Sequence, residues 1–408
     1  MGPCAFIFKE STVPLWGLSS RRRLERVLRR AGITDFTEDP GTVPAGTTVL
    51  LIRGDYLYDD RVINALVETP GLLLTTDPAG EGTAVAAHVP AELALQALSV
   101  LKETSGGISL PGVRTEGPDT LCPSYQERLR KSDPPFVLPV TPGNRRELEQ
   151  RLFSWSYKGV TDLVTKWVWP RPAMWCTRIC ARYGIRPNSV TLVGLILVII
   201  AGLFFARGRF GWGLLAGWLM TFLDTVDGKL ARVTVTSSKF GHLFDHIIDL
   251  VHPPIWYVVW GFGLSPAQAD ALGWPLQAVL WLIVIGYAAG RFVEAAFTLW
   301  VGRFGIFSWR PVDSYFRLVT GRRNPNLILL TAGVLAGHPE AGLLAVALWT
   351  GLTSLFLLLR LAMAVATRIG SGPLRSWLSD IDRGIYDGTL AVRLFGGRPM
   401  GRAGDRNA

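Results

Sequence analysis

Two pairs of aspartates lie at helical spacing beside long apolar segments of the chain. Asp224 and Asp227 are three residues apart, and Asp245 and Asp249 are four apart, so a helix would place each pair on one face. A carboxylate within a bilayer is costly and normally faces a polar cavity that contains a partner. Four neighbouring carboxylates also repel one another unless cations or protons neutralise them. The spacing therefore predicts a site for divalent cations.

The donor atoms indicate which metal such a site would take. Oxygen ligands favour Mg²⁺, Mn²⁺ or Ca²⁺ over zinc, and four carboxylates can hold two such ions. His242 and His246 lie four residues apart on the same predicted helix, and a zinc site is the alternative use for them; the hard oxygen ligands favour a packing or supporting role. A purely structural alternative is that the aspartates cap helices and form salt bridges with Lys229, Arg232 and Lys239. This would account for two aspartates better than for four.

The composition is that of a membrane protein. Of 408 residues, 49% are hydrophobic and only 18% are charged, which is unusual for a soluble enzyme. The net charge of +10 could indicate nucleic acid, but arginines beside apolar segments fit anionic lipid and membrane topology better. We therefore expect a membrane-lipid environment and no nucleic acid. The four cysteines show no metal-binding or disulfide pattern.

The apolar segments predict six membrane spans. Residues 187–206 are twenty residues without a charge, which is the length needed to cross the hydrocarbon core. The further predicted spans are 210–227, 243–264, 272–300, 314–337 and 340–367. Apart from Arg207 and Arg209, the lysines and arginines around these spans fall on one side, which predicts a multi-pass protein of the cytoplasmic (inner) membrane with both termini in the cytoplasm. The amino-terminal residues show no secretory signal pattern.

The first part of the chain has a different pattern. Short apolar strands alternate with helical segments, which predicts a cytoplasmic α/β domain of Rossmann-like type with a mainly parallel sheet. The predicted strands are 4–9, 48–54, 71–76 and 84–89, and the predicted helices are 20–32, 59–68 and 90–102. The predicted organisation is an α/β domain and linker at 1–143, an amphipathic interfacial helical region at 144–186, a six-helix transmembrane domain at 187–369 and a partly disordered tail at 370–408.

The acidic segment as a whole resembles a known family. From Asp224 to Asp249 the chain reads D-x2-D-G-x2-A-R-x8-G-x3-D-x3-D, which is similar to the signature of the CDP-alcohol phosphotransferases, integral membrane enzymes of phospholipid synthesis. The stretch GIRPNSVT at 184–191 is similar to the entry to that family's first span. The resemblance extends over about residues 155–367.

The resemblance implies a reaction and a cofactor. A substituted phosphate group would pass from a CDP-alcohol to an acceptor alcohol with release of CMP, assisted by two divalent cations, Mg²⁺ or Mn²⁺. CDP-diacylglycerol is the commonest donor in the family, and a soluble CDP-polyol is the alternative. The family also implies a homodimer.

The resemblance further implies roles for individual residues. Asp249 would take the proton from the acceptor hydroxyl. The metal ligands would be Asp224, Asp227, Asp245 and Asp249, and the residues beside the CDP moiety would be Gly228, Ala231 and Arg232. Arg291, Arg322 and Arg323 are the acceptor-binding candidates, because family members that use phosphorylated acceptors have arginines in comparable regions; for the last two, membrane topology is an equal explanation.

The amino-terminal domain resembles the sugar-nucleotide cytidylyltransferases, in which an aspartate such as Asp55 at a strand end holds metal and nucleotide. Some CDP-alcohol phosphotransferases carry such a domain. The stretch FKESTVPLWG after the first predicted strand lacks the glycine-rich loop that would cradle a triphosphate. A scaffolding or regulatory role is therefore favoured over an active cytidylyltransferase.

Two other functions fit some of these features. A membrane cation transporter also has acids in its spans, but it would distribute them over several helices near the membrane midplane. A membrane-anchored scaffold without catalysis would need no metal.

Overall fold

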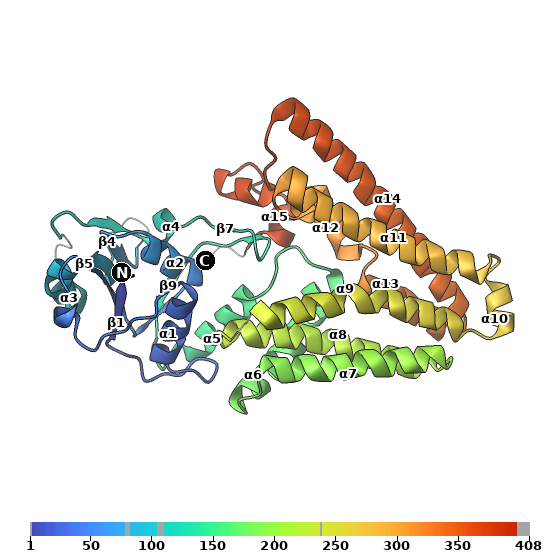
Figure 1. Cartoon of the computed structure of the whole chain (residues 1–408), viewed down its shortest axis with the longest axis horizontal. Helices are drawn as coiled ribbons and strands as arrows, with labels where there is room; N and C mark the ends of the chain where they lie inside the picture. Colours follow the sequence, from blue (N-terminus) through green and yellow to red (C-terminus); the bar gives the residue numbers. More distant parts are fainter. Residues whose placement is uncertain (1, 78–81, 104–109, 237–238, 398–408) are drawn as a thin grey trace, which may run out of the picture.

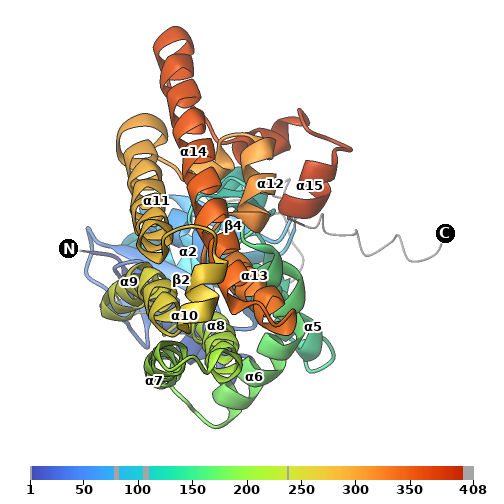
Figure 2. The same ribbon diagram turned by 90° about the vertical axis from the view of Figure 1, so that its right-hand side faces the viewer.

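The computed structural model describes residues 2–77, 82–103, 110–236 and 239–397, and it describes side chains in α9 (Lys239–Phe262) only from residue 247 onward. The chain forms an amino-terminal α/β domain and a helical region that extends away from it (Figure 1). Figure 2 shows the helices of this region as a bundle seen nearly end-on.

The central sheet of the α/β domain is mixed. Its strands, in spatial order, are β1 (Cys4–Phe8), β2 (Thr48–Arg53), β5 (Ala84–Pro90), β4 (Leu72–Thr75) and β6 (Arg114–Glu116). β1 pairs with β2, and β4 with β6, in parallel, whereas β5 is antiparallel to both β2 and β4. The prediction of a mainly parallel sheet is thus wrong. Too few residues separate β4 from β5 for the crossover that a parallel pair requires.

The predicted strands and helices of this domain are otherwise confirmed. The sheet packs against α1 (Ser20–Arg30), α2 (Asp60–Glu68) and α3 (Ala94–Lys102). The short elements are α4 (Pro118–Leu121), the strand pair β3 (Tyr56–Tyr58) and β9 (Val137–Pro139), and the strand pair β7 (Tyr125–Gln126) and β8 (Lys131–Ser132). Because β9 pairs with β3, the segment after β6 folds back over the domain.

A helical segment joins the α/β domain to the apolar helices. It contains α5 (Arg145–Trp155), the π-helix η3 (Val164–Val168) and α6 (Pro170–Arg182). Trp167 and Trp175 are largely exposed on it, and such aromatic side chains favour the headgroup layer of a membrane. That this segment lies in the headgroup layer stays a prediction.

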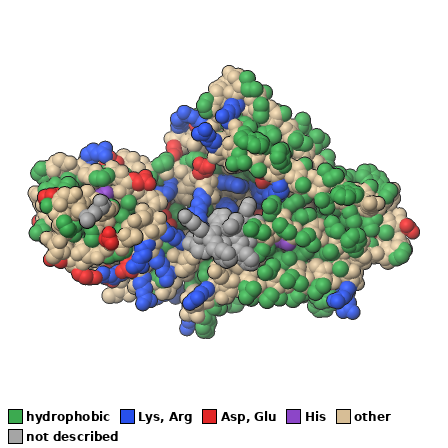
Figure 3. Space-filling view, viewed as in Figure 1, with side chains coloured by type: hydrophobic (Ala, Val, Ile, Leu, Met, Phe, Trp, Pro, Cys, Tyr) green, Lys and Arg blue, Asp and Glu red, His purple; other side chains and the backbone are tan. Residues whose placement is uncertain are grey.

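The helical region contains long apolar helices. Its elements are α7 (Pro187–Ala206), α8 (Phe210–Val233), α9, α10 (Pro266–Ala271), α11 (Leu276–Ala296) continued by η4 (Phe297–Gly302), α12 (Pro311–Val319), α13 (Arg323–Leu335) and α14 (Pro339–Ser371). Within the described residues three helices are long and apolar enough to cross a membrane, namely α7, α11 with η4, and α14; the apolar part of α9, Ile247–Phe262, is shorter. Hydrophobic side chains cover this half of the molecule (Figure 3), so the chain is a membrane protein.

The fifth predicted span, 314–337, is not one helix. The chain breaks between α12 and α13, and Gly321 N donates to Thr353 Oγ1 of α14 at 2.9 Å. A Cβ atom at Gly321 would lie 2.9 Å from the same oxygen, so the close approach to α14 requires glycine. This break places Arg322 and Arg323 at the amino-terminal end of α13.

Small residues and prolines shape the helices that carry the aspartates. A Cβ atom at Gly213 of α8 would lie 2.4 Å from the Phe205 ring of α7, so glycine allows these helices to pack closely. α9 contains Pro253 and Pro254, which have no N–H group to bond the carbonyls four residues earlier.

Part of the carboxyl-terminal tail is folded. Residues of the 3₁₀-helix η6 (Trp377–Arg383) and of α15 (Leu390–Phe395) pack into a hydrophobic core with η4 and α14. Trp377 and Phe395 are both 1% exposed. Residues 398–408 lie outside the described residues, so the prediction of a partly disordered tail stays a prediction.

The α/β domain contacts the carboxyl-terminal end of α8. Arg23 Nη2 of α1 donates to Val233 O at 2.5 Å, and Arg26 Nη1 donates to Thr234 O at 2.6 Å. Val235, which is 5% exposed, belongs to the hydrophobic core of the α/β domain. The connection between α8 and α9 is therefore attached to this domain.

Candidate active site

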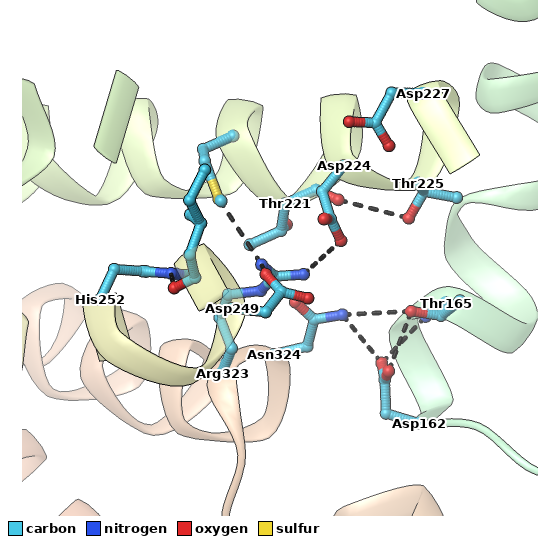
Figure 4. Close-up of polar contacts among 12 residues, drawn as sticks. Asp162, Thr165, Thr221, Asp224, Thr225, Asp227, Asp249, His252, Arg323 and Asn324 are labelled. Carbon is cyan, nitrogen blue, oxygen red and sulfur yellow. Dashed lines mark hydrogen bonds and ion pairs between the residues drawn. The ribbon is translucent and has the colours of Figure 1, made fainter. Parts of the chain in front are cut away.

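Two of the predicted aspartates converge. Asp224 of α8 and Asp249 of α9 both form ion pairs with Arg323, the first residue of α13, and each N···O distance is 2.5 Å. Figure 4 shows the guanidinium between the two carboxylates. Three helices thus bring two carboxylates and one guanidinium together at the end of the bundle next to the α/β domain.

A third aspartate of the signature lies nearby but makes a different contact. Asp227 is 6% exposed, and its carboxylate accepts a hydrogen bond of 2.6 Å from Thr191 Oγ1 in the first turns of α7. Figure 4 shows it on α8 one turn beyond Asp224 and away from Arg323. Thr191 is the threonine of the GIRPNSVT stretch, so two parts of the sequence resemblance meet in space.

The fourth aspartate lies outside the described side chains. Asp245, His242 and His246 belong to the part of α9 for which the structure describes only the backbone. Within the side chains that are described, no group of three or more His, Cys, Asp or Glu residues lies close enough to hold a metal ion.

The donor atoms that are described fit a hard divalent cation. Asp224 and Asp249 offer oxygen atoms, the donor type that Mg²⁺ and Mn²⁺ prefer, and the two carboxylates converge on a positively charged group.

Hydrogen bonds from another helix support the main chain around Asp249. Pro253 and Pro254 leave the carbonyls of Asp249 and Leu250 without their helical donors. Tyr287 of α11 donates its hydroxyl to both, at 3.4 Å to Asp249 O and 3.1 Å to Leu250 O. A tyrosine from another helix thus satisfies the carbonyls that the two prolines release.

The residues predicted to border a nucleotide are helical. Gly228, Lys229, Ala231 and Arg232 belong to the last turns of α8, which continues six residues beyond the end of the predicted span 210–227. A Cβ atom at Gly228 would lie 3.1 Å from Nη2 of Arg232, so glycine leaves room for the guanidinium. Lys229 is 3% exposed and donates to Ser156 O at 3.0 Å.

A cavity of about 360 Å³ connects these residues. Its charged lining comprises eight cationic side chains, Arg130, Lys158, Lys229, Arg232, Arg291, Arg317, Arg322 and Arg323, and four carboxylates, Asp162, Asp224, Asp249 and Glu294. Figure 3 shows Lys and Arg side chains gathered between the α/β domain and the apolar helices. Such an excess of positive charge attracts phosphorylated substrates.

The three acceptor candidates separate into two groups. Arg291 pairs with Glu294 at 2.5 Å, and Arg322 pairs with the other oxygen of the same carboxylate. Arg323 instead contacts the aspartates.

Several cavity residues lie outside the sequence prediction. Asp162, beside η3, accepts hydrogen bonds of 3.0 Å from Asn324 Nδ2 and 2.9 Å from Thr165 Oγ1. Burial raises the pKa of Asp162, but Arg317 and these hydrogen bonds outweigh that effect, so its pKa lies below the ordinary value. The segment was predicted only as an interfacial helix; a buried aspartate in an otherwise basic stretch was the available signal.

Lys158 projects into the same cavity from the segment between α5 and η3. Its side chain is accessible to solvent, although enough protein surrounds it to disfavour the charged form. Burial, together with Arg130, Arg232 and Arg317, lowers the pKa of Lys158 to about 8.

Comparison with known proteins identifies the helical region. Residues 185–366 match the family model described as CDP-alcohol phosphatidyltransferase. The chain is 41% identical over 71 residues to the phosphatidylinositol phosphate synthase of Streptomyces avermitilis, a match that covers 17% of this chain and 29% of that protein. It is 28% identical over 205 residues to the bifunctional IPC transferase and DIPP synthase of Rubrobacter xylanophilus, which covers 50% of this chain and 44% of that protein.

A third relative is an inner membrane protein of Escherichia coli, YnjF, which is 34% identical over 107 residues, or 26% of this chain and 50% of that protein. The matches thus span between 29% and 50% of the length of these three relatives. The apolar helices, the converging aspartates and the basic cavity all lie within or against the matched region. Residues 185–366 of this membrane protein are a domain of the CDP-alcohol phosphatidyltransferase family of enzymes.

Proposed function

We propose that the chain transfers a substituted phosphate group from a CDP-alcohol, CDP-diacylglycerol in particular, to an acceptor alcohol in the synthesis of a phospholipid or a polyol phosphodiester. The acceptor oxygen forms a bond to the β-phosphorus of the donor, the bond from that phosphorus to the CMP oxygen breaks, and the hydroxyl proton leaves to a base. The observation that carries this proposal is the convergence of Asp224 and Asp249 beside a basic cavity within the family domain.

The four signature aspartates are proposed to hold two divalent cations, Mg²⁺ or Mn²⁺. These ions, when bound, would neutralise charge on the diphosphate and on the departing CMP. Asp224 and Asp249 supply oxygens from two helices, and Thr191 orients Asp227 through its hydrogen bond. Asp245 is included on the sequence signature alone.

Asp249 is proposed to be the base that accepts the proton of the acceptor hydroxyl. Its carboxylate lines the cavity, and its main chain is held by Tyr287. Asp224 and Arg323 lie directly beside it. A carboxylate fixed next to the substrate space can act as a general base when the acceptor oxygen comes within hydrogen-bond distance.

Gly228, Ala231 and Arg232 are proposed to border the CDP moiety. Gly228 and Arg232 line the cavity, and a guanidinium binds phosphate oxygens through paired donors. Ala231 lies on the same helix and is partly buried. For the acceptor, Arg291 and Arg322 are proposed as direct contacts, whereas the contacts of Arg323 favour a role beside the aspartates.

The α/β domain is proposed to be a scaffold and not an active cytidylyltransferase. Asp55, the candidate metal-binding residue, is bound by Arg53 through two hydrogen bonds of 3.0 and 2.7 Å. Contacts of this domain with the end of α8, through Arg23 and Arg26, support the scaffolding role.

We further propose that the chain crosses the membrane six times, that both termini lie in the cytoplasm and that the protein forms a homodimer. α7, α11 with η4, and α14 have the length and hydropathy of spans, and α8, α9 and α13 pack between them with their polar ends at the cavity. Exposed apolar side chains on α7 and α14 provide lipid-facing or subunit-facing surface.

The test is a transfer assay with the purified full chain. CMP and lipid product are measured with CDP-diacylglycerol, Mn²⁺ or Mg²⁺, and a set of polyols and polyol phosphates. We expect release of CMP that depends on the acceptor and stops when EDTA is added. CMP release that is indifferent to the chelator, or the absence of product with any donor and acceptor, would refute the proposed function.

A further inference from the structure

A buried aspartate from the segment before the family domain is bonded to the helix that carries Arg323. Asp162 is 7% exposed and Asn324, the second residue of α13, is 5% exposed. The Nδ2 atom of Asn324 donates to Asp162 Oδ1 at 3.0 Å and to Thr165 Oγ1 at 3.2 Å. Figure 4 shows these bonds next to Arg323. Asp162 lies outside residues 185–366, the part of the chain that matches the family.

The carboxylate of Asp162 is itself held in place. Its Oδ1 atom accepts a hydrogen bond of 3.0 Å from the main-chain N–H of Thr165, and its Oδ2 atom accepts one of 2.9 Å from the hydroxyl of the same residue. The N–H groups three and two residues before Asp162 donate to Leu129 O at 2.9 Å and to Arg130 O at 3.1 Å. Val160, which is 1% exposed, belongs to a hydrophobic core with residues of η4 and α14. The surrounding structure thus fixes this acceptor for Asn324.

The first turn of α13 depends on contacts with other segments, because the chain breaks between α12 and α13. The side-chain amide of Asn324 donates to the segment of Asp162, and its Oδ1 atom has no hydrogen-bond partner among the described residues. A carboxylate beside the amino-terminal end of a helix is also stabilised by the helix dipole. The residue that precedes Asn324 is Arg323, which forms the ion pairs with Asp224 and Asp249. One hydrogen bond therefore joins the interfacial segment to the turn that carries this arginine.

We infer that Asp162 is a positioning residue for the transfer reaction: it holds Asn324 and the first turn of α13, so that Arg323 keeps its place between the two aspartates. In this role Asp162 contacts neither substrate and acts through Asn324. A displacement of about 1 Å near the reacting groups can lower a rate about 100-fold, so loss of the contact should lower kcat and leave substrate affinity nearly unchanged. The inference rests on the proposed function for the reaction that is measured.

The first experiment measures CMP release by the full chain with CDP-diacylglycerol, Mn²⁺ and the acceptor that is active in the transfer assay. Asp162→Ala and Asn324→Ala are each expected to lower kcat about tenfold, while both KM values and the Mn²⁺ concentration for half-maximal activity change less than about twofold. Asp162→Asn keeps an oxygen that can accept from Asn324 and should restore part of kcat. Asp39→Ala is the matched control, since Asp39 caps the 3₁₀-helix η1 (Pro40–Thr42) of the α/β domain, is exposed and does not line the cavity.

Three results of this assay would overturn the inference. Wild-type kcat in both alanine variants would show that the contact does not affect the reaction. A rise confined to one KM or to the Mn²⁺ concentration would make Asp162 a direct ligand of a substrate or a metal ion. Equal losses in Asp162→Asn and Asp162→Ala would assign the effect to the negative charge and not to the hydrogen bond.

The double variant tests whether the two residues act as one unit. Asp162→Ala combined with Asn324→Ala should have about the kcat of Asp162→Ala alone, because residues that act through one shared contact do not have additive effects. A loss equal to the product of the two single effects, about 100-fold, would indicate separate roles and contradict the inference.

Hydrogen exchange tests the contact without any activity. The full chain in detergent micelles, without substrate or metal ion, is followed by mass spectrometry of the peptide that contains the start of α13. Asp162→Ala should speed exchange there severalfold, because the first turn loses a contact that holds it, and Asp39→Ala should leave it unchanged. Exchange at the wild-type rate in Asp162→Ala would refute the inference. If the wild type releases no CMP with any acceptor, the proposed function fails, and the exchange result still decides whether Asp162 holds α13.

Circular dichroism and the melting temperature identify a variant that fails to fold. If Asp162→Ala does so, Asn324→Ala decides in both experiments, because it removes the same hydrogen bond from the other side. Wild-type kcat or wild-type exchange in a folded Asn324→Ala protein would then overturn the inference.

Discussion

Tyr287 of α11 donates its hydroxyl to the main-chain carbonyl of Asp249, 3.4 Å away, and to the next carbonyl, that of Leu250, 3.1 Å away. Both carbonyls lack helical donors because Pro253 and Pro254 follow four residues later. The position of the proposed base therefore depends on a tyrosine in another helix.

Removal of this hydroxyl tests that dependence. We expect Tyr287→Phe to lower the free energy of unfolding by about 1 kcal/mol, since two buried carbonyls lose their donor, and to lower kcat severalfold without a large change in KM. The measurement is CMP release together with a denaturant titration. Tyr183→Phe is the control, because Tyr183 is 75% exposed; equal effects of both changes would contradict the assignment.

Asp249 itself gives the most direct prediction. Asp249→Asn is expected to reduce transfer by a factor of about 10³ or more, because an amide cannot accept the acceptor proton, while the protein folds and still binds CDP. Asp270→Asn provides the matched control in the exposed α10. Retained turnover in Asp249→Asn would show that another group is the base.

The contact between Thr191 and Asp227 predicts a change in metal dependence. Thr191→Val removes the hydrogen bond of 2.6 Å that orients the Asp227 carboxylate. Loss of a group that orients a ligand typically costs about 10- to 100-fold in metal affinity, so the Mn²⁺ concentration for half-maximal CMP release should rise. Thr191→Ser should stay close to the wild type, and Thr367→Val, at a partly exposed position in α14 where the hydroxyl donates to Met363 O of the same helix, should have no effect.

Lys158 predicts a pH dependence of anion binding. Burial, with Arg130, Arg232 and Arg317, lowers its pKa to about 8, and only Asp224 opposes this. The side chain is charged below this pH and loses its charge as the pH rises through it. We therefore expect sulfate, whose own charge is constant here, to bind the metal-free protein severalfold more weakly at pH 9 than at pH 7.

Lys158→Gln identifies the group responsible. The variant should bind sulfate weakly at both pH values, with a flatter profile measured by calorimetry. A pH profile that matches the wild type would assign the titration to another group.

The attachment of the α/β domain to α8 predicts that mutations in this domain lower the transfer activity. Arg23→Ala with Arg26→Ala removes the donors to Val233 O and Thr234 O. Because α8 carries Asp224 and Asp227, we expect kcat for CMP release to fall severalfold. Membrane insertion, measured by detergent extraction, should be unchanged. The exposed Arg22→Ala is the control. Full activity of the double variant would argue against a scaffolding role.

The sequence predicted the parts of the molecule that follow from local spacing. The strands and helices of the α/β domain and the helical positions of Asp224 and Asp249 are of this kind, because each depends on periodicity within one segment. Sheet direction depends instead on which strands pair, and the short connection between β4 and β5 made the sheet mixed. The break before α13 depends on packing against Thr353.

The missed cavity residues share one property. Arg130, Lys158 and Asp162 lie between regular elements or at their ends, where no periodic pattern indicates burial, and they reach the site through contacts with distant parts of the chain. Arg323 was noticed, but its position between two aspartates of the signature follows only from how α8, α9 and α13 pack.

Val235, which follows the helix that carries Asp224, belongs to the hydrophobic core of the α/β domain. Expressing the two halves as separate polypeptides would expose that core on one product and remove the arginine donors from the end of α8 on the other. Truncated versions meant to simplify purification should therefore aggregate or lose activity, and crystallisation or electron microscopy is better attempted with the two halves joined.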